Sequence, residues 1–278
     1  INKMKTNKFD FAKFSFALIA ILAVMFVVSC GTKQAKQAED SSMTTKEEAF
    51  KSVTKYPIPT AFEVIKLLNK AGATYILSIN NPVENVDKYI ATKSKALNLG
   101  VYGADLSYAS TYQMKQETMN YLKVSKKMID DLQITSAFNV EFAQRVEKNI
   151  DNKDSLIQII SNSFYDTYEF LVNNGKDNTS LLVMTGSWIE GLYLTTQIAI
   201  VSKNSEDFLK IVANQKEPLN KLVELMKPYE SDKDIAEMAQ DLKPLVDIYA
   251  TVGADQITKE QFEQILKLIT DVRTKVTQ

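Results

Sequence analysis

The segment Asn178–Ser202 restricts the possible folds more than any other part of the chain. It reads NTSLLVMTGSWIEGLYLTTQIAIVS, and Glu190 is the only charged residue among its 25 positions. At 100° per residue one stripe of this helix is polar, and it comprises Gly186, Glu190, Tyr193 and Gln197. Apolar side chains occupy nearly all of the remaining surface, so we expect the central helix of a bundle, packed on most sides. Its length would span a bilayer, but Glu190 and Gln197 argue against that placement.

The rest of the chain is also predicted to be helical. Its 278 residues include 8 glycines and 6 prolines, well below the usual ~7% and ~5%. No segment shows the sustained two-residue alternation that is typical of a strand. We therefore predict an all-α fold, a multi-helix bundle of nine or ten helices. The expected helices run from Thr60 to near Gly72 and over about 85–98, 102–132, 138–150, 153–173, 178–202, a segment capped by Ser205, a segment opening near Pro218, 233–252 and 258–276. A bend near Thr111 is an alternative for the helix 102–132.

Several of these boundaries depend on single residues. Thr258 followed by Gln261 forms a capping-box pattern that opens the last helix. Gly100 is expected to end the helix before it, and Pro244 to kink or split the segment 233–252. We interpret residues 44–278 as one helical domain, with a junction between two helical subdomains near 174–178 as the alternative.

The first thirty residues carry the features of a secretory signal. Four lysines lie within the first thirteen positions, and Phe14–Val28 follows with Ser15 as its single polar residue. A basic start and a short apolar run are typical of a signal peptide. Fifteen residues at 1.5 Å per residue cover roughly 22 Å, less than the ~30 Å hydrocarbon core.

The end of the apolar run resembles a bacterial lipobox. Residues 27–30 read VVSC, and Cys30 is the only cysteine in the chain. The resemblance implies cleavage after residue 29, a diacylglyceryl group on the Cys30 thiol and acylation of the new amino terminus. Residues 1–29 would then be the signal peptide and the polar residues 30–43 a lipidated tether. The alternative is an ordinary, uncleaved signal anchor in which the Cys30 thiol has no role.

Composition excludes several classes of function. The chain has no histidine, which removes the commonest general base and metal ligand, and the lipid would consume its one thiol. It contains no Gly-rich phosphate loop, so we expect no metal and no cofactor other than the covalent lipid. Nucleic-acid binding is not expected, because the net charge is −1 and only Arg145 and Arg273 are arginines.

Glu190 is the first candidate site residue. A carboxylate within an apolar helix must be paired, protonated or directed into a cavity. It could contact a ligand, or act as an acid or base, in a pocket with Trp188, Tyr193 and Gln197. A structural ion pair with a neighbouring helix or a narrow exposed strip is the preferred alternative. We expect Glu190 to be mostly buried beside a lysine, tyrosine or amide.

A second candidate site lies on one face of the segment 100–116. Tyr102, Asp105, Tyr108 and Tyr112 share this face at helical spacing. Tyrosines interleaved with a carboxylate suit recognition of a small, sugar-like ligand. The preferred alternative is a helix–helix seam whose hydroxyls bond to neighbouring groups.

The stretch Tyr56–Asp130 resembles uncharacterised lipoproteins of Bacteroidota. The resemblance rests on YPIPT, NNPVENVDKYI, NLGVYGADLSYASTYQMKQ and YLKVSKKMID, and it implies no activity. Surface-exposed lipoproteins of that phylum resemble one another in an acidic cluster directly after the cysteine. Here no acid occurs between Cys30 and Glu39, so the resemblance implies the periplasmic face of the outer membrane of a Gram-negative bacterium.

Two classes of function stay open from the sequence. The first is a non-catalytic binding or scaffolding module, attached to the membrane by its lipid, that holds an envelope protein or a small ligand. The second is a histidine-free enzyme, a hydrolase or lyase that uses Glu190 or Asp105. The lack of histidine and of any nucleophile motif favours the first class.

Overall fold

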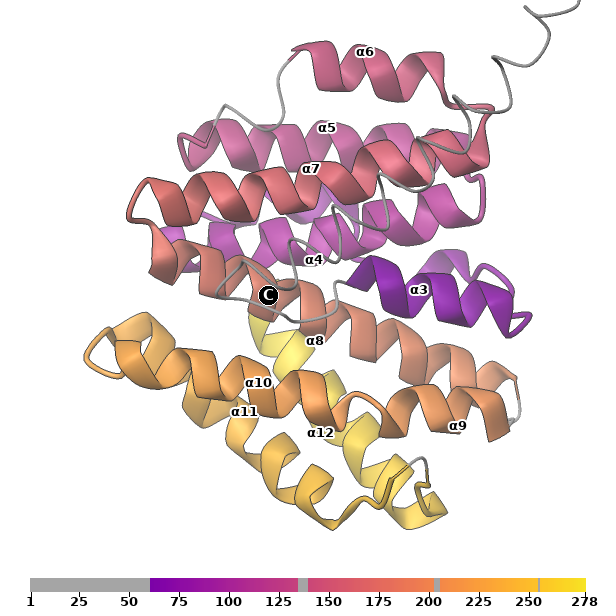
Figure 1. Cartoon of the computed structure of the whole chain (residues 1–278), viewed down its shortest axis with the longest axis vertical. Helices are drawn as coiled ribbons and strands as arrows, with labels where there is room; N and C mark the ends of the chain where they lie inside the picture. The colour runs from indigo at the N-terminus through magenta and orange to yellow at the C-terminus, as the bar shows by residue number, and fades with distance from the viewer. Residues whose placement is uncertain (1–60, 135–139, 203–205, 255) are drawn as a thin grey trace, which may run out of the picture. The chain divides into compact units, whose positions relative to one another are not determined.

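The structure, a computed structural model, describes residues 61–134, 140–202, 206–254 and 256–278. These residues form ten α-helices and three short 3-10 helices, with no strand among them (Figure 1). The predicted all-α fold is therefore confirmed. The predicted signal peptide 1–29, Cys30, the tether 30–43 and the cap at Ser205 lie outside the described residues.

The α-helices are α3 (Ala61–Lys70), α4 (Thr92–Thr111), α5 (Lys115–Asp131), α6 (Val140–Lys148), α7 (Lys153–Asn173), α8 (Asp177–Val201), α9 (Glu206–Ala213), α10 (Lys216–Met226), α11 (Lys233–Thr251) and α12 (Lys259–Thr277). The 3-10 helices are η2 (Leu77–Ile79), η3 (Val83–Lys88) and η4 (Lys227–Tyr229).

Two helices, α4 and α8, form the centre of the bundle. Every residue of α4 from Ala96 to Thr111 is buried. In α8 the residues from Ser180 to Ala199 are buried except Tyr193 and Gln197, which are half-buried. The sequence-based expectation that this apolar segment is the central helix is confirmed. None of the described helices is both long enough and apolar enough to cross a membrane.

The backbones of α4 and α8 touch where they cross. A Cβ atom on Gly100 would lie 2.0 Å from the carbonyl oxygen of Val183, and one on Gly186 would lie 1.9 Å from that of Leu97. Only glycine permits so close an approach. The prediction that Gly100 ends a helix was therefore wrong: it lies inside α4, where it admits α8.

The remaining helices surround this pair. The helices α3, α5 and α7 contact α4, while α9, α10, α11 and α12 contact α8 (Figure 1). At the periphery α6 packs on α7. Because α8 packs on α4, helices on both sides of the proposed junction at 174–178 share one core.

The capping box predicted for the last helix is present, and two other predictions about helix boundaries are corrected. In this capping box Thr258 accepts from Gln261 N and the Gln261 side chain accepts from Thr258 N. The predicted helix 102–132 is instead two helices, because the chain turns between α4 and α5 with Gln113 at φ 57°. Pro244 does not split α11. Pro244 has no N–H to donate to the carbonyl of Gln240, four residues earlier in the helix. Both residues are exposed, so water can bond to that carbonyl.

Candidate functional site

A salt bridge between Glu190 and Arg273 lies between α8 and α12. Arg273 Nε donates to Glu190 Oε2 at 2.9 Å, and Arg273 Nη2 donates to Glu190 Oε1 at 3.0 Å. The Glu190 side chain is fully buried and that of Arg273 is 14% exposed. The same Nη2 also donates to the carbonyl of Ile79 at 3.3 Å. Glu190 is thus buried and paired as expected, but its partner is an arginine rather than the predicted lysine, tyrosine or amide.

Asp105 joins this salt bridge from α4. It is fully buried and forms a hydrogen bond with Glu190, so the two sites that the sequence placed on separate helices are one cluster. Its two oxygens also accept from the loop before η3: Oδ1 from Asn80 Nδ2 at 2.8 Å and Oδ2 from Asn81 N at 3.1 Å. Neither of these donors carries a charge.

Burial raises the pKa of both carboxyl groups in this pair. Burial and the adjacent Glu190 carboxylate raise the pKa of Asp105 well above its ordinary value, and Arg273 opposes this shift. Burial also raises the pKa of Glu190, whereas Arg273 and the hydrogen bond with Asp105 lower it. Because only Glu190 makes a two-point contact with the guanidinium, we assign the charge to Glu190 and the proton to Asp105.

The loop that carries Asn80 and Asn81 is itself held by tyrosines. Tyr102 donates to the carbonyl of Pro82 at 2.9 Å, and Tyr121 donates to the carbonyl of Asn81 at 3.3 Å. The side chain of Asn81 donates to Tyr89 Oη at 3.0 Å. This loop and its tyrosines form a buried polar layer over the carboxyl pair.

The same layer fastens the end of α12. Asn98 Nδ2 donates to the carbonyl of Val276 at 2.8 Å, and Tyr89 Oη donates to that of Thr277 at 3.1 Å. Carbonyls in the last turn of a helix have no partner within the helix. Here side chains of α4 and of the segment before it provide those partners.

The other predicted tyrosines form a stack near the end of α4. Tyr108 accepts from Ile76 N at 2.9 Å and donates to the carbonyl of Thr74 at 3.3 Å. The ring of Tyr75 stacks on Tyr108 with centroids 4.6 Å apart, and Tyr112 meets Tyr108 edge-on at 5.1 Å. The predicted tyrosine face is therefore covered by the chain itself, but by the loop before η2 rather than by the helix of the preferred alternative, and Tyr112 Oη has no hydrogen-bond partner among the described residues.

The remaining candidates on α8 divide between two sides of the helix. The ring of Tyr193 lies under the guanidinium of Arg273, with 4.3 Å from Cζ to the ring centroid. Gln197 is half-buried and makes no hydrogen bond with the described residues. Trp188 precedes Glu190 by two residues, or ~200° around the helix. It is buried on another side, and its Nε1 has no partner among the described residues.

Sequence reasoning missed Arg273 and the asparagines. One signal could have identified Arg273, because it is one of only two arginines in a lysine-rich chain. A planar guanidinium suits two-point pairing with a buried carboxylate better than an ammonium does. Asn80 and Asn81 lie in a loop, where the sequence offers no periodicity to indicate burial.

Every carboxyl oxygen of Asp105 and Glu190 already has a hydrogen-bond donor within the chain, from a side chain or a backbone group. Asp105 and Glu190 both have 0% exposure. No group of three or more metal-ligating side chains occurs within the described part of the chain. This arrangement orders three helices and a loop, and it leaves neither carboxyl group oriented toward solvent.

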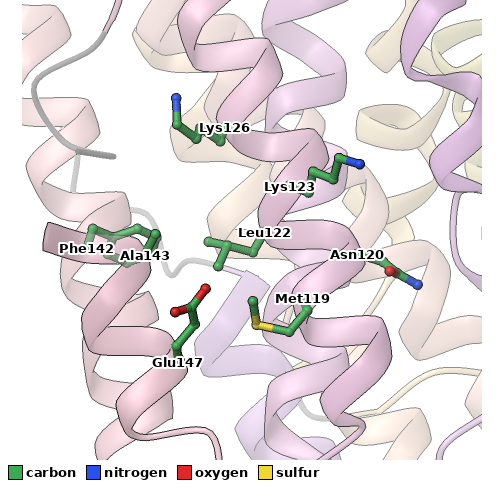
Figure 2. A pocket seen from close by; sticks show the side chains of 8 residues that line it. All are labelled: Met119, Asn120, Leu122, Lys123, Lys126, Phe142, Ala143 and Glu147. Atoms are coloured by element: carbon green, nitrogen blue, oxygen red, sulfur yellow. The ribbon is translucent and has the colours of Figure 1, made fainter. Parts of the chain in front are cut away.

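An open groove lies elsewhere, between α5 and α6 (Figure 2). Its volume is about 380 Å³, and it is lined by Met119, Asn120, Leu122, Lys123, Lys126, Phe142, Ala143 and Glu147. Figure 2 shows Leu122 and Met119 of α5 facing Ala143 and Glu147 of α6 across the gap. None of these residues is a candidate from the sequence, because the groove depends on the spacing of two helices.

Comparison of the chain with protein-family models, with curated proteins and with solved structures gave no match. The geometry of the two sites therefore carries the functional argument.

Proposed function

We propose that this chain is a non-catalytic binding module, attached to a membrane by a lipid on Cys30, that holds a small ligand or an envelope protein in the groove between α5 and α6. The observation that carries the proposal is the contrast between the two sites. The carboxyl groups of Asp105 and Glu190 are buried and fully bonded within the chain, whereas the groove is open and largely apolar.

The alternative, a hydrolase or lyase that uses Glu190 or Asp105, is less well supported. A general acid or base must come within hydrogen-bonding reach of its substrate. A substrate here would have to displace Arg273 from Glu190, or the Asn81 backbone from Asp105, and enter between closely packed helices. Separating Glu190 from Arg273 leaves buried charges unpaired and costs several kcal/mol, and removing the Asn81 N–H leaves a buried polar group of Asp105 without its partner.

The proposed location rests on the sequence alone. The motif VVSC after a lysine-flanked apolar run supports lipidation of Cys30. The lack of acidic residues between Cys30 and Glu39 supports the periplasmic face of the outer membrane. In this proposal the chain is bound to the membrane through its lipid, and the helical body presents the groove to partners nearby.

The proposal is tested by purifying the full chain from its native envelope and identifying what accompanies it. Ala143→Trp fills the groove without changing its charge, and Ala236→Trp adds the same ring at an exposed position of α11. We expect at least one small molecule or protein to accompany the wild type and Ala236→Trp, and to be depleted about tenfold with Ala143→Trp. Identical inventories from all three, with unchanged circular dichroism, would contradict a binding role for the groove.

A further inference from the structure

We propose that the groove between α5 and α6 binds a single-chain amphiphile with an anionic headgroup, such as a long-chain carboxylate. This inference rests on the proposed binding function and adds the chemical class of the ligand. It follows from the joint placement of an apolar floor, an ammonium at the rim that forms no ion pair with a described residue, and a carboxylate at the opposite end.

The floor of the groove suits a hydrocarbon chain. Leu122 and Phe142 are 5% exposed yet line the groove, and the half-buried Met119 and Ala143 complete the apolar surface. Methionine adapts its shape to irregular apolar ligands. The α6 helix packs on α7, so its residues Ala143 and Glu147 face α5 across open space (Figure 2).

The charges at the rim indicate the polarity of the ligand. Lys123 is exposed and makes no ion pair with any described residue. Lys126, one turn further along α5, pairs with Asp130 of the same helix while half of its side chain stays accessible. Two ammonium groups one helical turn apart offer several donors to a carboxylate or phosphate headgroup, although Lys126 already donates to Asp130.

Glu147 determines the direction in which the ligand lies. Its carboxylate lies in the groove beside Met119, and Leu122 lies between it and the end of the groove where Lys126 is (Figure 2). An anionic headgroup at this end would be repelled, whereas one beside Lys123 and Lys126 would be attracted. A cationic amphiphile of the same length would have to place its head against Glu147 instead.

The size of the groove favours a small amphiphile over a helical peptide. Its volume of about 380 Å³ lies within the roughly 300–1,000 Å³ of small-molecule sites. A stable protein partner covers roughly 800 Å² on each side. A second hollow, between α11 and α12, is less suited to an anion, because Asp241 and Asp271 line it and its Lys275 is paired with Asp241 at 2.7 Å.

The experiment uses the full chain in lipid nanodiscs and a photoreactive, alkyne-tagged hexadecanoate. We expect cross-links within residues 119–126 and 142–147, competed by unlabelled hexadecanoate and not by hexadecyltrimethylammonium or hexadecanol. Lys123→Gln should weaken labelling about fivefold, the effect of one surface charge on an anionic partner. Glu147→Gln should strengthen it, and Lys221→Gln on an exposed face of α10 should leave it unchanged.

The ligand class and the binding function can fail separately. Equal competition by the cationic amphiphile, labelling outside the two segments, or labelling unaffected by Lys123→Gln would overturn the anionic-amphiphile assignment. If one of these three results is found and Ala143→Trp nevertheless loses a species from the native envelope, the binding function stands while this assignment fails. If that variant changes neither the envelope inventory nor the labelling, both proposals fail.

Discussion

Arg273, in the last helix, forms a two-point salt bridge with Glu190 in the middle of the central helix, across 83 residues of sequence. The ring of Tyr193 lies against a face of the guanidinium, and Asp105 bonds to the carboxylate. The pair therefore joins α12 to α8 and α4 at a buried point.

Removing either partner of the salt bridge should destabilise the fold strongly. Glu190→Ala leaves a buried guanidinium unpaired, and such changes cost about 3–5 kcal/mol. Arg273→Lys should also be destabilising, because an ammonium cannot reproduce the two-point contact. Urea denaturation monitored by circular dichroism measures both effects. The control is Lys275→Ala, on the same helix as Arg273. It removes an exposed ion pair with Asp241 of α11 and should change the stability little. Wild-type stability of Glu190→Ala would contradict the buried pair.

The proton assigned to Asp105 predicts an unusual dependence of stability on pH. Since the pKa of Asp105 is raised in the folded state, the folded protein keeps a proton that the unfolded chain releases above about pH 4. The stabilisation from this proton is complete below about pH 4 and is lost as the pH rises toward the raised value, by at most about 1.4 kcal/mol per pH unit.

Asp105→Asn isolates this contribution. The amide cannot titrate, so the free energy of unfolding of the wild type minus that of Asp105→Asn should fall as the pH rises above about 4. Exposed ion pairs occur in both proteins and cancel in the difference. Urea melts at a series of pH values provide the measurement, and a pH-independent difference would show that Asp105 is ionised when folded.

The crossing of α4 and α8 should not tolerate a methyl group. Gly186→Ala would place its Cβ atom 1.9 Å from the carbonyl oxygen of Leu97, and relieving that overlap should cost about 1–3 kcal/mol or more. Gly191→Ala is the matched control on the same helix, because its nearest neighbour is the Ala61 side chain at 3.3 Å. We expect thermal melts to separate the two variants. Equal melting temperatures would mean that the helices can move apart freely.

The lipobox resemblance predicts the fate of Cys30. Mass spectrometry of the mature protein should find a polypeptide that begins at Cys30 and carries acyl chains. Cys30→Ala should accumulate as an unprocessed and unacylated precursor. An unmodified Cys30 thiol in the mature chain would refute the anchor while leaving the groove proposal to its own test.

Local features of the sequence were sufficient to predict the helical fold. The scarcity of glycine and proline and the absence of alternation predicted the class, and the Thr258–Gln261 capping box placed the start of α12 correctly. These signals act within a few residues of the chain. The nearly uncharged surface of α8 likewise predicted its central position, because an apolar surface must be covered wherever it lies.

The tertiary structure alone decided which groups meet. Periodicity placed Glu190 and Asp105 on faces of two helices, but a face does not specify its partner. Their contact depends on the crossing angle and register of α4 and α8, which the close backbone approach at Gly100 and Gly186 permits. Gly100 had been interpreted as a helix end, because the sequence does not distinguish a glycine that stops a helix from one that admits a neighbour. The groove between α5 and α6 escaped prediction for the same physical reason: it is a distance between two helices, set by how α6 packs on α7 rather than by any residue within it.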